Sequence, residues 1–332
     1  MEKKLLKTCS EKTIKILRGN QQLRFLMNQA AVQDILTNEY FLTGHSWKLA
    51  EPAFTTLRRQ LFSDPIWRFG PLRIHEVASE GYHLLREFTP IEDTTYCDLG
   101  CGTMHPLGIA AIFYLNGAAH TLSTDLFPAD ERRAAEALAD LLWDCFCSME
   151  KWCWSGNTGL FRERLAQFNI PALQSGNLKT GTAKVPMRHV VTDIHSPSLQ
   201  PNSIDLMSSR AVLEHFLDFG TAVKRLFDLM RPGGVAAHVI DIIDHRHYND
   251  PEAFHYFSFL AEGDEWSDGL VNRLRSSEIK SHFQQAGFEI LKYEEIRSEI
   301  PAGFRDKIAG RFRAMSLEEL SVSGIKCVLK KP

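Results

Sequence analysis

The chain has 332 residues, of which 44% are hydrophobic and 24% are charged. This length is enough for one large domain or two modest ones, and the composition is typical of a globular protein with a sizeable core. The 38 basic and 41 acidic residues give a net charge of -3, so the charge balance does not favour a nucleic acid as partner.

The first residues and the cysteines indicate the compartment. Residues 1–7 carry charge and no long apolar run follows them, so the sequence predicts no signal peptide. No stretch reaches the roughly 18 uninterrupted apolar residues of a membrane span. The seven cysteines are scattered, a pattern typical of reduced thiols. We therefore expect a cytoplasmic protein with no membrane partner.

Residues 1–90 are expected to be helical. Apolar residues recur at helical spacing over 26–36, 47–62 and 71–88, and a proline follows the second and the third of these segments. We interpret the region as a helical N-terminal cap. It would pack on the main domain or pair with a second copy of the chain in a homodimer.

A glycine turn follows the first expected strand, residues 95–99. This strand carries Asp98, and Gly100 and Gly102 come directly after it. Glycines allow a tight strand-to-helix turn in which the backbone comes close to a ligand, and the helix expected over 107–116 would offer N–H groups to it. The third glycine of a G-x-G-x-x-G pattern is absent, so the turn alone is a weak signal.

An acidic residue ends the second expected strand, residues 121–124. Asp125 stands about 20 residues after the glycine turn, where a carboxylate can accept both hydroxyls of a ribose. The alternative is that Asp125 caps a helix that begins near Pro128.

The connection to the third strand is longer than a plain crossover needs. Residues 129–149 are predicted as one long helix and residues 176–184 as an exposed, mobile loop. Cys145, Cys147 and Cys153 lack the paired C-x2-C spacing of structural zinc sites, so we interpret them as packing residues.

The rest of the chain alternates between strand and helix patterns. Asp193 and Ile194 follow the third strand, Ser209 and Arg210 end the fourth, and a Pro-Gly-Gly turn precedes the fifth. Strands are expected over 188–192, 202–209, 235–240, 288–294 and 323–329, and helices over 219–230 and 277–286.

Asp98-Leu99-Gly100-Cys101-Gly102-Thr103 resembles motif I of the class I S-adenosylmethionine-dependent methyltransferases. The segment 205–234, with its Leu-Glu-His run and Pro-Gly-Gly turn, also resembles this family, and the resemblance covers about residues 91–332. It implies an α/β fold with a Rossmann-like, mostly parallel sheet, an antiparallel last strand and a helical N-terminal extension over 1–90. Insertions would lie at about 130–187 and 246–272.

The resemblance implies S-adenosyl-L-methionine as the cofactor. The glycine turn would hold its methionine part, Asp125 the ribose, and Asp193 with the backbone N–H of Ile194 the adenine. For Asp193 the alternative is a turn cap. Glu214 and His215 are expected to be structural. The expected cofactor-binding residues are Asp98, Gly100, Cys101, Gly102, Asp125, Leu126, Asp193, Ile194, Ser209 and Arg210.

The segment after the fifth strand, Asp241 to Tyr248, is rich in ionisable side chains. A histidine beyond the end of a strand can take a proton from a substrate hydroxyl near neutral pH. His245 is the first candidate for a general base and His247 the second, with Asp244 or Asp241 orienting the imidazole. Alternatively these groups only bind substrate or cap the loop. They could also ligate a divalent metal, but their local clustering does not favour this, and no metal is expected.

Two segments are candidates for the wall of a substrate pocket. Residues 248–266 are rich in aromatic side chains and would form either a lid or core packing. The N-terminal cap would either close over the cofactor, as in many methyltransferases of the family, or pack elsewhere.

Methyl transfer from a sulfonium needs an aligned nucleophile, exclusion of water and, for a hydroxyl, loss of a proton. We therefore predict an enzyme that methylates a hydroxyl of a small, partly apolar acceptor. The alternatives are an N-methyltransferase acting on a small amine, a non-catalytic protein that binds the cofactor and a partner, and an NAD-dependent oxidoreductase. The sequence does not identify the acceptor.

Overall fold

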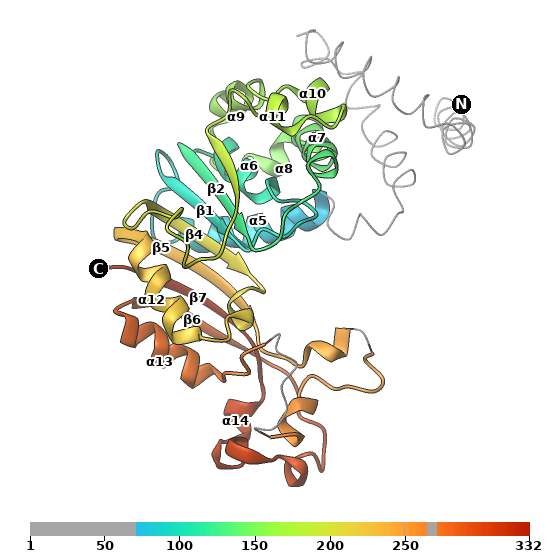
Figure 1. The fold of residues 1–332 in the computed structure, drawn as a ribbon, viewed down its shortest axis with the longest axis vertical. Helices are drawn as coiled ribbons and strands as arrows, with labels where there is room; N and C mark the ends of the chain where they lie inside the picture. The colour runs from blue at the N-terminus through green and yellow to red at the C-terminus, as the bar shows by residue number, and fades with distance from the viewer. Residues whose placement is uncertain (1–70, 249, 264–270) are drawn as a thin grey trace, which may run out of the picture.

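The computed structural model describes residues 71–248, 250–263 and 271–332 (Figure 1). The helices predicted over 26–36 and 47–62 lie outside the described residues. Within these ranges, seven strands form a single sheet with helices on both of its faces. None of the helices in the described ranges has the length and apolar character needed to cross a membrane.

The sheet has the strand order β3-β2-β1-β4-β5-β7-β6. The first five strands are parallel, and β7 runs antiparallel between β5 and β6. The predicted mostly parallel sheet with an antiparallel last strand is therefore confirmed. The order reverses between β1 and β4, and ligands of such sheets bind beyond the carboxyl ends at this switch point. The strands are β1 (Thr95–Leu99), β2 (His120–Asp125), β3 (Met187–Val191), β4 (Ile204–Arg210), β5 (Met230–Asp241), β6 (Glu289–Arg297) and β7 (Val322–Lys330).

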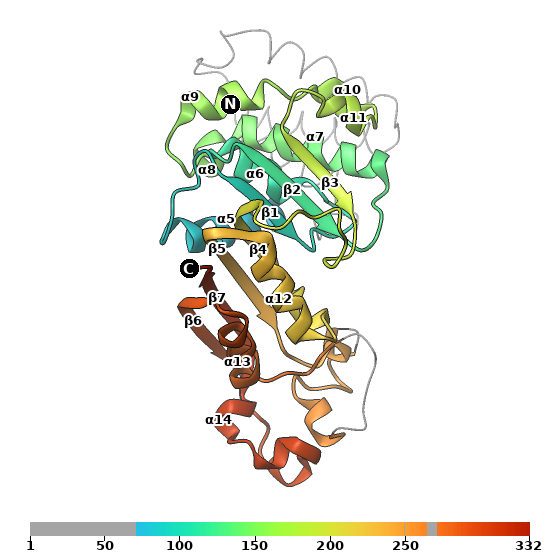
Figure 2. The same cartoon turned by 60° about the vertical axis from the view of Figure 1, so that its left-hand side comes forward.

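Helices cover both faces of the sheet (Figures 1 and 2). α5 (Pro71–Arg86) and α6 (Gly108–Leu115) lie on one face, and α12 (Phe219–Leu229) and α13 (Ser276–Ala286) on the other. Although α5 belongs to the region expected as a cap, it packs directly on β4 and β5. Tyr96 of β1 stacks on Phe113 of α6 with 3.6 Å between ring centroids, so apolar burial and aromatic contact both hold this layer.

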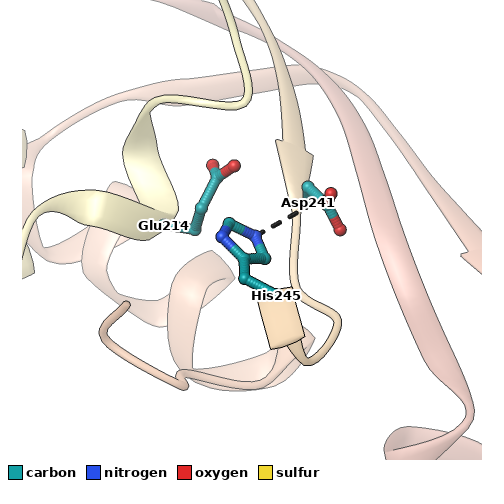
Figure 3. A group of neighbouring side chains, drawn as sticks. All are labelled: Glu214, Asp241 and His245. Carbon is teal, nitrogen blue, oxygen red and sulfur yellow. Dashed lines mark ion pairs between the residues drawn. The ribbon is translucent and has the colours of Figure 1, made fainter. Parts of the chain in front are cut away.

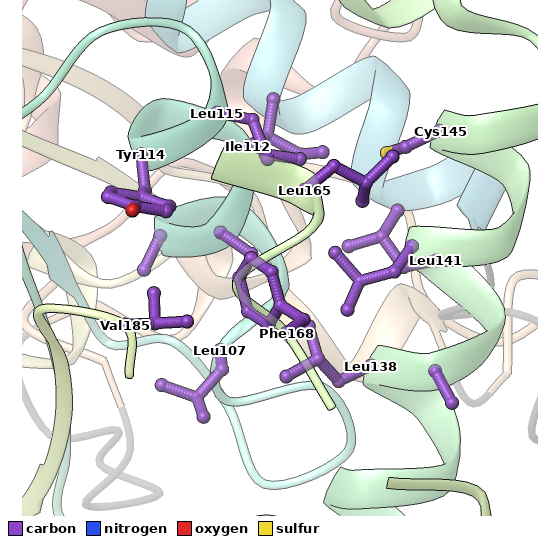
Figure 4. Close-up of a cluster of buried hydrophobic side chains, with 14 of the residues drawn as sticks. Leu107, Ile112, Tyr114, Leu115, Leu138, Leu141, Cys145, Leu165, Phe168 and Val185 are labelled. Carbon is purple, nitrogen blue, oxygen red and sulfur yellow. The ribbon is translucent and has the colours of Figure 1, made fainter. Parts of the chain in front are cut away.

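The long insertion between β2 and β3 forms a helical layer outside α6 (Figure 4). Cys145 is buried in its core, and Cys147 and Cys153 pack against that core, which confirms the packing interpretation of these cysteines. The insertion contains α7 (Glu131–Cys147), α8 (Met149–Trp152), α9 (Thr158–Leu165), α10 (Ile170–Gln174) and α11 (Leu178–Gly181).

The loop predicted over 176–184 is wrong in part, because α11 lies within it. Asn177 caps this helix by accepting a hydrogen bond from the Thr180 N–H (2.9 Å), and Gly181 is buried against Leu173. A stretch with two glycines, two threonines and an asparagine has the composition of a loop, but the side-chain cap and the buried contact stabilise one helical turn here.

Segments after β5 and after β6 lie side by side beyond the end of the sheet, coloured orange and red in Figures 1 and 2. Phe257 and Phe259 are buried there against Ile308 and Phe312. Of the two interpretations of the aromatic insertion, core packing is therefore confirmed for these two phenylalanines. The short elements are η3 (His245–Tyr248), η4 (Ser258–Ala261), η5 (Arg305–Lys307), η6 (Gly310–Ala314) and α14 (Leu317–Leu320), and η2 (Leu213–His215) follows β4.

Arg275 ties this small unit to the sheet. Its side chain is completely buried and donates to the carbonyl oxygens of Ile242 (2.9 Å), Leu320 (3.2 Å) and Val322. Burial lowers the pKa of the guanidinium to about 10, so it remains charged at neutral pH. The bond to Ile242 fixes the chain directly after β5, three residues before η3 begins.

Candidate active site

A cleft of about 570 Å³ opens at the carboxyl ends of β1, β2 and β3. Its walls come from the turn after β1, the ends of β2 and β3, and the segment after β4. This is the switch point of the sheet, where a ligand is expected. Of the residues predicted to bind a cofactor, Gly100, Gly102, Asp125, Leu126, Asp193 and Ile194 line the cleft.

The turn after β1 needs glycine at two positions for different reasons. Gly100 has a φ of +68°, and a Cβ atom there would lie 2.4 Å from the Cγ2 of Val212. Gly102 has a φ of +74°, but a Cβ atom there would meet nothing within 4 Å. The backbone at Gly100 is therefore packed against the protein, while Gly102 borders open space in the cleft.

The carboxylate of Asp125 is oriented by the backbone on both sides. Its Oδ2 accepts the N–H of Gly102 (2.8 Å), and its Oδ1 accepts the N–H of Phe127 (3.0 Å). Each carboxylate oxygen can accept more than one hydrogen bond, so both can still take a hydroxyl from a ligand. The alternative role as a helix cap is not realised, because Asp130 caps α7 by accepting the Arg133 N–H.

Asp98 lies under the turn and is 2% exposed. Among the described residues, its Oδ2 has no hydrogen-bond partner. Burial, reinforced by the carboxylate of Asp125, raises the pKa of Asp98 to about 8. A buried oxygen without a partner is costly, so Asp98 suits a ligand that brings a positively charged donor.

The segment after β3 is held in place by Arg225 of α12. Its guanidinium donates to the carbonyl oxygens of Ile194 (3.1 Å), Ser196 (3.2 Å) and Leu199 (2.6 Å). Asp193 accepts the N–H of His195 (2.7 Å) and also lines the cleft. The turn-capping role and a place in the cleft are therefore both present for Asp193.

Besides Asp98, three residues predicted at the cofactor lie outside the cleft lining. Ser209 Oγ pairs with Nδ1 of His238 (2.8 Å), and Arg210 forms an ion pair with Glu80 of α5. These two successive side chains point to opposite faces of the sheet, and neither lines the cleft. Cys101 lies within the turn, and burial raises the pKa of its thiol, which keeps it protonated.

Sequence reasoning missed several cleft residues. Phe127 and Leu217 are 65% and 62% exposed, and both line the cleft. His215, expected to be structural, lines it as well. The available sequence signal for Phe127 was an apolar side chain soon after the acidic residue that ends a strand. A flat apolar ligand such as a purine can pack on a side chain in this position.

Glu214, Asp241 and His245 meet beyond the end of β5 (Figure 3). Nε2 of His245 lies 3.8 Å from Oδ2 of Asp241, and the ring contacts that of His215 edge-on with 5.1 Å between centroids. Glu214 is 2% exposed. Burial raises the pKa of Glu214 to about 8, and the charge of Asp241 adds to the rise.

Asp244 and His247 have other partners. The carboxylate of Asp244 is buried and binds Arg246 through two bonds, from Nε (3.0 Å) and from an outer nitrogen (2.6 Å). Of the two carboxylates expected to orient His245, Asp241 is therefore the one that pairs with it, while Asp244 binds Arg246. His247 donates from Nδ1 to the carbonyl of Phe254 (2.8 Å), which leaves Nε2 as the nitrogen able to accept a proton.

The family of the chain follows from comparison with known proteins. A family model described as a methyltransferase domain matches residues 70–293 of the chain. The chain belongs to this family. It is an S-adenosylmethionine-dependent methyltransferase, as the sequence predicted. Comparison with curated proteins gave no match.

Several solved structures are similar to this methyltransferase at low identity. A methyltransferase from Mesorhizobium loti is 17% identical (TM-score 0.42) and covers 77% of this chain and 99% of its own. Geranyl diphosphate methyltransferase in complex with S-adenosylmethionine is 12% identical (TM-score 0.44), covering 81% and 93%. The cyclase SpnF is 17% identical (TM-score 0.42), covering 78% and 80%.

The residues at the cleft fit S-adenosyl-L-methionine. Asp98, under the glycine turn, has a buried oxygen with no hydrogen-bond partner among the described residues, and Asp125 presents two oxygens oriented by backbone N–H groups. The absence of a side chain at Gly102 leaves open the space that a Cβ atom would enter. Asp98 would hold the ammonium group of the cofactor, Asp125 its ribose, and the segment at Ile194 its adenine.

The stability of the cofactor-free methyltransferase is expected to fall as pH rises from about 5 to about 8, partly through Asp98. Its pKa of about 8 in the folded protein exceeds the ordinary 3.8, so the folded state keeps a proton that the unfolded chain has released in this window. Each pH unit there costs at most about 1.4 kcal/mol. The side chain of Asp98→Asn stays neutral at every pH. In urea unfolding, the free energy of unfolding of the variant minus that of the native protein should therefore increase by about 2–3 kcal/mol between about pH 5 and about pH 8.

Asp193→Asn is the matched control for this prediction, because it removes an exposed carboxyl from the same cleft. Its unfolding free energy should follow that of the native protein at both pH values. Parallel pH profiles for Asp98→Asn and the native protein would contradict the assignment of the buried proton to Asp98.

Proposed function

We propose that this methyltransferase transfers a methyl group to a hydroxyl of a small-molecule acceptor, with a histidine at the end of β5 as general base. The observation that carries the proposal is the position of His245. This imidazole lies beside the carboxylate of Asp241 and contacts His215, which itself lines the cofactor cleft. A proton acceptor therefore stands next to the place where the methyl donor would bind.

The cofactor supplies an electrophilic methyl group on a sulfonium. The chain has to hold it and align the acceptor behind the methyl carbon, and good alignment alone lowers the barrier by several kcal/mol. The glycine turn, Asp98 and Asp125 would fix the cofactor at one side. The end of β5 and η3 would then receive the acceptor.

Removal of the hydroxyl proton is assigned to His245. A carboxylate near an imidazole favours its protonated form, so Asp241 would stabilise the imidazolium as it forms. Tyr248 donates its hydroxyl to Asp241 Oδ2, and the Ile243 N–H donates to Oδ1 (3.2 Å), which together fix the carboxylate. His247 is the second candidate because its Nε2 can accept a proton.

A small, partly apolar acceptor suits this end of the sheet. Tyr248 is 64% exposed beside Asp241, and Leu217 is exposed at the rim of the cofactor cleft. An amine acceptor is the second candidate function, since it needs less help from a base. The imidazole and its carboxylate favour the hydroxyl.

Product analysis tests the proposal. The protein is incubated with S-adenosylmethionine and a panel of phenols, alcohols and primary and secondary amines, and formation of S-adenosylhomocysteine is followed with each. We expect turnover with members of the phenol or alcohol sets and an O-methyl product by mass spectrometry and NMR. Methylation of amines without turnover of any hydroxyl compound would contradict the proposal.

A further inference from the structure

We propose that Glu214, Asp241 and His245 form a binding site for one divalent metal ion. They come from three elements: η2 after β4, the last residue of β5, and η3. One ligand atom from each lies within 4.8 Å of the other two. Figure 3 shows the imidazole of His245 between the two carboxyl groups, so all three side chains converge on one region.

The burial of Glu214 is an independent observation that points to a ligand. The side chain is 2% exposed, and neither Oε1 nor Oε2 has a hydrogen-bond partner in the described part of the chain. Two unsatisfied oxygens in one buried carboxyl group are unusual, because each such group is costly without a partner. A cation bound between Glu214 and Asp241 would satisfy these oxygens.

The backbone holds Glu214 in this position. Asn272 donates its backbone N–H to the carbonyl of Glu214 (2.8 Å), and its side-chain amide donates to the carbonyls of Leu213 (3.0 Å) and Phe216 (3.2 Å). Three bonds from one residue thus clamp η2. The carboxyl group is therefore part of a fixed site rather than a side chain that turned inward by chance.

Protein cations near the site are engaged elsewhere. Arg246 binds Asp244 and Glu262, and no lysine or arginine among the described residues forms an ion pair with Glu214 or Asp241. Among the described residues, the two carboxyl groups therefore lie close together with only the imidazole of His245 as a basic neighbour. A divalent ion would balance their charge.

The donor set indicates the class of ion. Two carboxylates with one imidazole suit Mn²⁺, Fe²⁺ or Zn²⁺ better than Ca²⁺, which prefers oxygen ligands throughout. Three protein ligands also leave coordination positions open, as in catalytic metal sites. The sequence expectation of no metal rested on ligands close together in the chain, whereas Glu214 comes from a different connection.

The meaning of the site for catalysis rests on the proposed function. A metal-bound hydroxyl loses its proton more readily, so the ion would acidify the same acceptor hydroxyl. In that state the ligating nitrogen of His245 would hold the metal. The proton would leave to His247 or water as the new O–CH₃ bond forms and the S–CH₃ bond of the cofactor breaks, which releases S-adenosylhomocysteine. In the ion-free protein, His245 would take the hydroxyl proton. In the ion-bound protein, the metal would make that proton easier to lose.

Direct titration tests the site without any need for turnover. The full-length protein is treated with a chelator, and Mn²⁺ is added in a calorimeter. Mn²⁺ is the probe because thiolates bind it weakly, and six cysteines lie in the described part of the chain. We expect one Mn²⁺ per chain, with affinity lowered at least about 10-fold in Glu214→Gln and in Asp241→Asn.

Glu262→Gln is the matched control. This carboxylate also lies in the segment after β5, but it pairs with Arg246 instead of the proposed metal site. Its Mn²⁺ affinity should equal that of the native protein. Binding of S-adenosylhomocysteine is measured in the same samples to show that each variant is folded. No Mn²⁺ binding by the native protein, or equal binding by all variants, would overturn the metal site and leave the proposed hydroxyl methylation to be judged by product analysis alone.

Discussion

Replacing Gly100 with alanine is expected to destabilise the folded protein by about 3 kcal/mol and to abolish cofactor binding. The backbone there has a φ of +68°, which costs a residue with a side chain about 1–2 kcal/mol. The added Cβ would also lie 2.4 Å from Cγ2 and 2.8 Å from Cγ1 of Val212, and overpacking of this kind costs about 1–3 kcal/mol. Urea unfolding and calorimetric titration with S-adenosylhomocysteine measure the two effects.

Gly102→Ala is the matched comparison, because its φ of +74° is similar but its Cβ would meet no protein atom within 4 Å. We expect a loss of about 1 kcal/mol in stability together with a clear loss of cofactor affinity, since the methyl group would enter the cleft. Equal destabilisation by the two substitutions would show that the contact with Val212 is not what makes Gly100 necessary.

His245→Ala is expected to lower kcat for an accepted hydroxyl substrate by about 100-fold to 10,000-fold, the usual contribution of a general base. Cofactor affinity should stay within about 2-fold of the native value, because no predicted cofactor contact involves this side chain. Steady-state kinetics with the best acceptor from the panel gives kcat, and titration with S-adenosylhomocysteine gives the affinity.

The control for this substitution is His255→Ala. This histidine also lies in the segment after β5, and its ring accepts a long hydrogen bond from the backbone N–H of Phe257 (3.4 Å). It should retain kcat. If His245→Ala also retained kcat while His247→Ala lost it, the base would be the second candidate. Full activity in both variants would remove the end of β5 from the reaction.

Much of the sheet was predictable because its signals are local. Residues 95–99 form β1 as predicted, and the predicted strands at 121–124 and 188–192 correspond to β2 and β3 within about one residue. Short apolar runs ended by Asp98, Asp125 and Asp193 carry this information, since buried parallel strands end where polar residues reach the ligand edge.

The parts that sequence reasoning missed depend on contacts between distant residues. Arg210 stands at the end of β4, but its partner Glu80 is 130 positions away on α5 and draws the side chain to the other face. Glu214 and Asp241 come from different connections, and only the parallel pairing of β4 with β5 brings them together. A local motif shows neither which face a strand residue takes nor which distant group faces it.

Titration of the native protein and Asp125→Ala with S-adenosylhomocysteine tests the central claim most directly. The claim is that the cleft beside the glycine turn holds the cofactor, with Asp125 as the ribose acceptor. We predict one binding site per chain in the native protein and an affinity lowered at least about 100-fold in the variant, because two hydrogen bonds to a charged group are lost. Absence of binding by the native protein, or equal affinity in both proteins, would contradict the claim.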